Sequence, residues 1–95
     1  MTDLIKEKFK SKAIIYGDMR MYFIEIAKDV VKECEVNKRN VVTLEAFRIT
    51  GNGIQPSQEN SVDFNLNEEN WNRAIIFLEL EANNECVYEI WYEGY

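Results

Sequence analysis

The stretch 67–95, NEENWNRAIIFLELEANNECVYEIWYEGY, decides how the rest of the chain can fold. It contains both tryptophans and two runs in which apolar and polar residues alternate, separated by a short polar joint at 83–85. Alternation with a period of two is typical of half-buried strands. The spacing therefore predicts a β-hairpin with strands over 73–82 and 86–93.

The three-residue joint predicts the register of this hairpin. Its inward face would pair apolar residues: Leu80 with Tyr88, Leu78 with Ile90 and Ile76 with Tyr92. On the outward face, Glu79 would lie opposite Glu89, with Phe77 opposite Trp91. Directly opposed like charges cost up to about 1 kcal/mol in a sheet. One interpretation is that this outward face serves binding of a cationic partner rather than stability. The alternative is that the helices or a second copy of the chain cover this face and the opposed glutamates turn into water.

An alternative for the same stretch is a helix over 68–82. Helical spacing is satisfied by five apolar residues: Trp71, Ala74, Ile75, Leu78 and Ala82. Asn67 could cap such a helix, and two glutamates would lie in its first turn. The strand is favoured because Ile76, Phe77 and Leu80 fall off the helical stripe.

The N-terminal 40 residues predict one or two helices. Thr2 and Asp3 can cap a first helix that is expected to end before Gly17. The alternative is a helix over 3–11 followed by a short strand over 13–16, because periodicity does not decide the structure of that compact apolar run. Asp18 can cap a second helix running to about residue 37. Its apolar stripe contains Tyr22, Phe23, Ile26, Ala27, Val30, Val31 and Cys34.

From residue 41 the period changes to two and predicts strands over 41–51 and 61–66. In the first strand, the two faces both carry apolar residues, which indicates contacts on both faces or a bulge. Gly51-Asn52-Gly53 predicts a turn of type I′. Pro56 excludes 54–60 from a central strand. In the second strand, Val62, Phe64 and Leu66 should point inward.

These elements predict an α+β fold: one or two N-terminal helices packed on one face of a four-stranded, mainly antiparallel sheet. With 95 residues the chain suffices for one small domain, 1–95. Its 46% hydrophobic content argues against disorder. No apolar run approaches the ~20 residues of a membrane span, and the N-terminus lacks the apolar stretch of a signal peptide. We therefore expect a cytoplasmic protein.

The net charge of -6 is unevenly distributed. Residues 1–40 carry nine Lys/Arg and seven Asp/Glu, a net +2, whereas residues 41–95 carry two and ten, a net -8. An acidic field repels nucleic acid and anionic membranes and attracts basic proteins. The charge therefore predicts a basic protein partner and no binding of nucleic acid or membrane.

Enzymatic and metal chemistry is not indicated by any motif. The chain has no histidine, so it has no histidine-based triad or imidazole metal site. Cys34 and Cys86 are expected to be buried thiols, and a disulfide between them is the less favoured alternative. A carboxylate-only Ca²⁺ or Mg²⁺ site stays open at Asp63, Asn65, Asn67 and Glu69, which lack the glycine and final glutamate of an EF-hand loop. We expect no enzyme, metal or cofactor; an enzyme with an unfamiliar carboxylate site is the remaining alternative.

The segments ENWNRAIIFLELE (69–81) and YEIWYEG (88–94) resemble several families of small acidic immunity proteins, which bacteria produce to neutralise their own toxins. The resemblance covers about a quarter of the chain. It implies binding of one cognate basic toxin, a nuclease by first preference, by a monomer or weak homodimer. The expected partner-binding residues are Glu45, Asp63, Phe77, Glu79, Glu81, Glu89, Trp91 and Glu93. The alternatives are a phage-encoded DNA-mimic inhibitor of a host nuclease and a homodimerising structural domain.

Overall fold

The computed structural model describes residues 3–95, which form three α-helices and a six-stranded antiparallel sheet. The helices are α1 (Leu4–Lys8), α2 (Ile24–Val36) and α3 (Trp71–Leu78). The strands are β1 (Ile14–Tyr16), β2 (Met19–Phe23), β3 (Val41–Thr50), β4 (Gly53–Pro56), β5 (Val62–Asp63) and β6 (Val87–Tyr92). Three short 3₁₀ turns are η1 (Lys10–Lys12), η2 (Gln58–Asn60) and η3 (Glu81–Asn83). The predicted α+β class agrees with this architecture, but four strands were too few.

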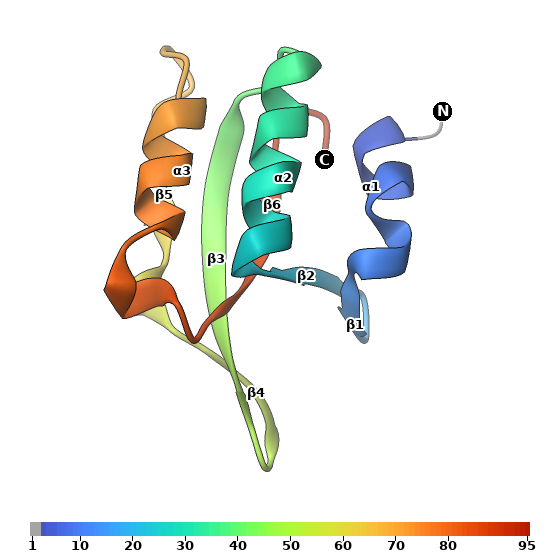
Figure 1. Ribbon diagram of the computed structural model, residues 1–95, viewed down its shortest axis with the longest axis vertical. Coiled ribbons are helices and arrows are strands. Elements are labelled where there is room, and N and C mark those ends of the chain that lie inside the picture. The colour runs from blue at the N-terminus through green and yellow to red at the C-terminus, as the bar shows by residue number, and fades with distance from the viewer. Residues whose placement is uncertain (1–2) are drawn as a thin grey trace.

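The sheet has the strand order β1-β2-β6-β3-β4, and β5 pairs with the edge of β3 that also binds β4. Helices α2 and α3 lie side by side over β6 and β3, and α1 packs against the other flank of α2 (Figure 1). One face of the sheet is therefore covered by helices. The opposite face, which carries Thr43, Glu45, Glu89 and Trp91, is called the helix-free face below.

Alternation along β6 distributes side chains between two apolar clusters. The main core, between sheet and helices, includes Cys86, Tyr88, Ile90 and Tyr92, as the sequence predicts. Val87 points to the helix-free face and packs there with Met21 and Phe47 in a smaller cluster. Ile14 and Met19 of the β1–β2 hairpin pack against this second cluster. The hairpin therefore covers one end of the helix-free face.

Residues 71–78 form helix α3, so the predicted strand over 73–82 and its hairpin register are wrong. The alternative helix over 68–82 is right in kind but too long. Trp71, Ala74 and Leu78 are buried at i, i+3 and i+7 spacing, whereas Ile76 is 62% exposed. In place of a hairpin partner, β6 pairs with β2 and β3. The apolar residues at 76, 78 and 80 alternate with polar residues by coincidence. Packing of the buried residues Trp71, Ala74 and Leu78 determines that this segment is a helix.

Buried asparagines fix both ends of α3. The Val41 amide donates to Asn70 Oδ1 at 2.9 Å, and Asn70 Nδ2 donates to the Val41 carbonyl at 2.7 Å. Beyond the other end, Asn83 Nδ2 donates to the Phe77 carbonyl at 2.8 Å, and Asn60 Nδ2 donates to Asn83 Oδ1 at 2.7 Å. An asparagine side chain both donates and accepts, so it satisfies buried backbone groups that have no strand partner.

At the N-terminus the structure selects the shorter of the two predicted helices. Asp3 caps α1 by accepting from the amides of Ile5 and Lys6, while the alternative cap, Thr2, lies outside the described residues. The predicted cap role of Asp18 is wrong, because Gly17, with a φ of 60°, and Asp18 form the turn between β1 and β2. The predicted second helix consequently begins at Ile24, since residues 19–23 pair as a strand.

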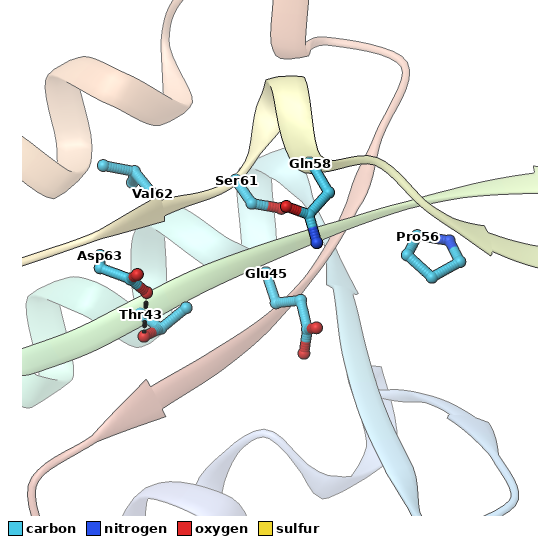
Figure 2. A pocket seen from close by; sticks show the side chains of 7 residues that line it. All are labelled: Thr43, Glu45, Pro56, Gln58, Ser61, Val62 and Asp63. Atoms are coloured by element: carbon cyan, nitrogen blue, oxygen red, sulfur yellow. Dashed lines mark hydrogen bonds between the residues drawn. The ribbon is translucent and has the colours of Figure 1, made fainter.

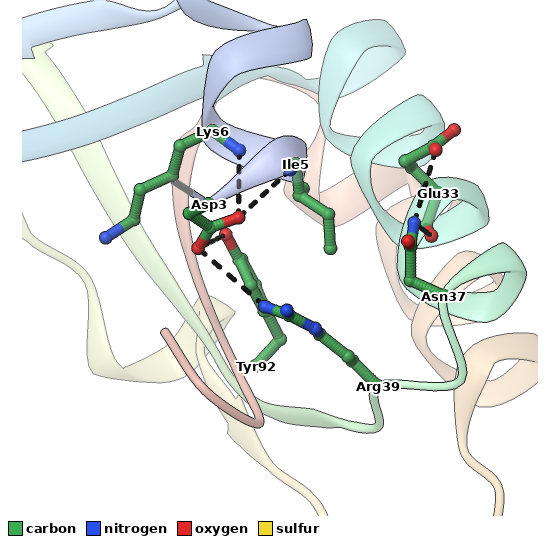
Figure 3. Close-up of polar contacts among 7 residues, drawn as sticks. All are labelled: Asp3, Ile5, Lys6, Glu33, Asn37, Arg39 and Tyr92. Atoms are coloured by element: carbon green, nitrogen blue, oxygen red, sulfur yellow. Dashed lines mark hydrogen bonds and ion pairs between the residues drawn. The ribbon is translucent and has the colours of Figure 1, made fainter. Parts of the chain in front are cut away.

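Asp3 also joins the two ends of the chain (Figure 3). Its Oδ2 accepts a 2.7 Å hydrogen bond from the Tyr92 hydroxyl, and Arg39 Nη1 lies 3.9 Å from the same oxygen. Burial raises the pKa of Asp3, but the Tyr92 hydroxyl, the capped amides and the Arg39 charge outweigh it and hold the pKa below its ordinary value. The charged carboxylate therefore helps to hold α1 against β6.

The predictions for the middle of the chain hold in part. Strand β3 is present, and the two features predicted as alternatives occur together: apolar contacts on both faces and a register shift between Val41 and Thr43. The turn after it is present, but it is not type I′, because Gly53 has φ of 128° while Gly51 and Asn52 have negative φ. The strand predicted over 61–66 is limited to 62–63, and Leu66 is 45% exposed rather than inward.

Candidate functional site

The predicted partner-binding residues fall on different sides of the molecule. Four of them, Glu45, Asp63, Glu89 and Trp91, lie on strands at the helix-free face. Three belong to α3 and the segment after it, on the helix-covered side: Phe77, Glu79 and Glu81. Phe77 packs against the main core, and Glu79 lies 3.7 Å from Lys28. Glu93 lies beyond the end of β6 and accepts from the Asn40 amide at 2.7 Å.

Two rows of directly paired residues cross the helix-free face. In the first, Thr43 of β3 lies between Trp91 of β6 and Asp63 of β5, and its hydroxyl donates to Asp63 Oδ1 at 2.7 Å. In the second, Glu45 of β3 lies opposite Glu89 of β6. Glu89 therefore faces another glutamate, but this residue is Glu45, and the predicted pairing of Glu89 with Glu79 is wrong.

Glu89 is the buried member of this pair, with only 5% of its surface exposed. The Tyr95 hydroxyl donates to Glu89 Oε2 at 3.1 Å. Burial raises the pKa of Glu89 and the Glu45 charge adds to this, whereas hydrogen bonds from Tyr95 and the Arg20 backbone amide act in the other direction. The net effect is a raised pKa. Glu89 is therefore buried beneath the surface of the helix-free face. The negative charge that a partner can reach on this face is that of Glu45 and Asp63.

Trp91 supplies an exposed aromatic ring beside these carboxylates. Its side chain is 40% exposed, and its ring contacts that of Tyr95 at a centroid distance of 4.6 Å. Lys6 Nζ lies 4.0 Å from the centroid of the Tyr95 ring. The indole is thus held by a neighbouring ring while much of its surface stays open to a partner.

Glu45 and Asp63 form no ion pair with the cations of residues 3–95. Within residues 3–95, the ion pairs involve other carboxylates, among them Glu33 with Lys8 and Glu85 with Arg48. The charges of Glu45 and Asp63 therefore remain available to an external cation.

A cavity of about 210 Å³ lies between β3 and the segment that joins β4 to β5 (Figure 2). It forms because β4 and β5 pair with different parts of the same edge of β3, and η2 bridges the gap. Asp63 and Thr43 are at one end, Pro56 is at the other, and Glu45 lies between them. The cavity is smaller than the 300–1,000 Å³ typical of cofactor sites.

The described residues give no support for a metal site, a reactive thiol or a membrane-spanning helix. No group of three or more His, Cys, Asp and Glu residues within 3–95 is arranged to hold a metal ion, and Asn65 is engaged in accepting from the Asn67 amide. Cys34 and Cys86 are both buried and free, and burial raises the pKa of Cys34 to about 12, so its thiol stays protonated. None of the described helices has the length and apolar character needed to cross a bilayer.

Three residues of this face were missed: Thr43, Tyr95 and Pro56. The alternation of 41–50 does place Thr43 on the same side as Glu45, so its position was open to inference. Tyr95 was not, because only the turn at Gly94, with φ of 83°, brings the last residue back beside Trp91. Pro56 likewise depends on the pairing of β4 with β3.

Comparison with protein families, with curated proteins and with solved structures finds no match to this chain.

Proposed function

We propose that this protein binds a basic protein partner through its helix-free face and neutralises it, in the manner of an immunity protein acting on a toxin. A basic nuclease is the partner of first preference, because an enzyme that binds phosphates presents the cations this face would attract. The observation that carries the proposal is a pair of carboxylates, Glu45 and Asp63, on the same face as the 40% exposed Trp91. No cation of the described residues forms an ion pair with either carboxylate.

Each part of the face would have a separate role in binding. Surface charges such as those of the half-buried Glu45 and the exposed Asp63 raise the rate of association and favour partners of opposite charge. Trp91 can supply the apolar contact area of an anchor, since tryptophan and arginine dominate the binding energy of protein interfaces. The net charge of -8 over residues 41–95 would attract a basic partner from a distance, and salt would weaken that attraction.

DNA mimicry has less support, since it calls for two long rows of carboxylates. The helix-free face carries one opposed pair, Glu45 with Glu89, and Glu89 is almost fully buried. Self-association through this face would place like charges of two copies together, which is unfavourable without an intervening cation.

The test is co-purification with a candidate basic nuclease, followed by affinity measurement at two salt concentrations. The informative variant is Glu45→Lys/Asp63→Lys, which reverses both charges of the face. The matched control is Glu35→Lys/Glu81→Lys, which makes the same charge change at exposed positions on the helix-covered side. We expect the first variant to lose binding and the control to keep it within a few-fold. Equal binding by both variants would remove the helix-free face from the proposal.

A further inference from the structure

We infer that the cavity between β3 and the β4–β5 connection is a subsite for one arginine side chain of the partner protein. This inference rests on the proposed function, because it assigns the chemistry of a single contact within the proposed binding face. The cavity holds about 210 Å³, the space of about seven water molecules. That volume suits the end of one long side chain better than a cofactor or a folded segment.

The polar groups of the cavity wall are those that a cation requires. Ser61 Oγ is already engaged, because it accepts from the Ala46 amide and donates to the Ser57 carbonyl, both at 2.8 Å. Thr43 uses its hydroxyl hydrogen on Asp63 Oδ1. Among the hydrogen bonds of residues 3–95, Asp63 Oδ2 and the Glu45 carboxylate receive no donor. The polar groups of the wall without a partner are thus the Glu45 carboxylate and Asp63 Oδ2, which carry negative charge on adjacent strands, and the neutral side-chain amide of Gln58.

Apolar groups in the same wall favour arginine over lysine. Pro56 and Val62 line the cavity together with the two carboxylates. A guanidinium group is planar and weakly hydrated, so it can lie against apolar surface while its five N–H donors reach more than one carboxylate. A lysine ammonium group is compact and strongly hydrated, and it would lose more hydration in this space. Trp91, at the far end of the Thr43 row, would then contact the partner beside its arginine.

The probe for this subsite is the peptide acetyl-Gly-Arg-Gly-amide, titrated at low salt into the isotope-labelled full chain and followed by NMR amide shifts. We expect saturable shifts at Thr43, Ser61 and Asp63. The peptide carrying citrulline, a neutral isostere of arginine, should give none, and the lysine peptide should bind more weakly. Glu45→Gln/Asp63→Asn should weaken arginine binding about tenfold, as loss of two exposed charge pairs implies. Glu35→Gln/Glu81→Gln, with the same loss of charge elsewhere, should titrate like the wild type.

Shifts of equal size with the citrulline peptide, or tighter binding of the lysine peptide, would overturn the arginine assignment. So would a Glu45→Gln/Asp63→Asn chain that titrates like the wild type. These outcomes are separable from failure of the proposed function. If the arginine peptide does not bind while Glu45→Lys/Asp63→Lys still abolishes capture of the nuclease, the face stands and the subsite falls.

Discussion

Replacing Asn70 with alanine removes the side chain that anchors the start of α3 to the first residue of β3. The change deletes two hydrogen bonds, at 2.9 and 2.7 Å, to the amide and carbonyl of Val41, a residue with 0% exposure. Each buried backbone group left without a partner costs about 1–3 kcal/mol. The summed range for the two groups is about 2–6 kcal/mol. Because water can enter part of the vacated space and satisfy these groups, we expect a total loss in the lower half of that range, about 3 kcal/mol.

That loss is large beside a total stability of about 5–14 kcal/mol for a chain of this length. Urea unfolding followed by tryptophan fluorescence measures it, and Trp71, buried next to Asn70, reports on the same region. With a slope of about 2 kcal/mol per molar urea, the midpoint should fall by about 1.5 M. Asn72→Ala, at an exposed position of α3, is the control and should stay within about 0.5 kcal/mol. Equal midpoints for the two variants would refute the anchoring of α3 by Asn70.

Three further predictions concern stability. Asp3→Ala should lose about 1 kcal/mol of cap stabilisation near neutral pH. A carboxyl group with a lowered folded pKa stabilises the fold above its unfolded pKa and stops doing so as pH falls through the folded pKa, so the variant should also lose less stability than the wild type on acidification. Urea unfolding midpoints across an acid pH series check both effects. Glu89 has a raised pKa, so its contribution to stability should decrease as pH rises from its unfolded pKa through the folded one; Glu89→Gln should lack this decrease, and identical pH profiles for the two chains would contradict the burial of Glu89. Gly53→Ala should lower the free energy of unfolding by about 1–3 kcal/mol, because φ at this residue is 128° and the new Cβ would lie 3.2 Å from the Tyr16 hydroxyl. Gly51→Ala is the control and should be close to neutral, because Gly51 has negative φ and open space around it. Thermal or urea unfolding measures both.

Strand β6 illustrates which features local sequence pattern predicts well. Its helix-facing residues, Tyr88 and Ile90 among them, alternate with Glu89 and Trp91, and this alternation predicts which residues share a face. It does not predict that Glu89, on the opposite face, is buried as well. Alternation also predicts β3, whose two apolar faces were visible in its sequence. Both strands were expected nearly at their observed limits.

Helix α3 illustrates where the pattern is ambiguous. Ile76 and Leu80 extend an alternating run, yet both are at least half exposed, so their hydrophobicity says nothing about burial here. The choice of helix depends on Trp71, Ala74 and Leu78 packing against α2 and β3, and on the Asn70 contact with Val41 across 29 residues. Contacts at that separation are not encoded in any short window.

The candidate site was predicted in part for a related reason. Glu45, Asp63, Glu89 and Trp91 were named because each is an outward position on an alternating strand. Their actual grouping follows from β3 lying between β5 and β6, which the predicted hairpin did not include. Glu79 and Glu81 were placed with them only through the strand that α3 replaces.

The most direct test of the central proposal is an NMR map of the labelled chain in complex with its basic partner. The proposal predicts that the largest changes lie at Thr43, Glu45, Asp63 and Trp91, with the outer surfaces of α2 and α3 little affected. Changes concentrated on those two helices, with the helix-free face unperturbed, would contradict it.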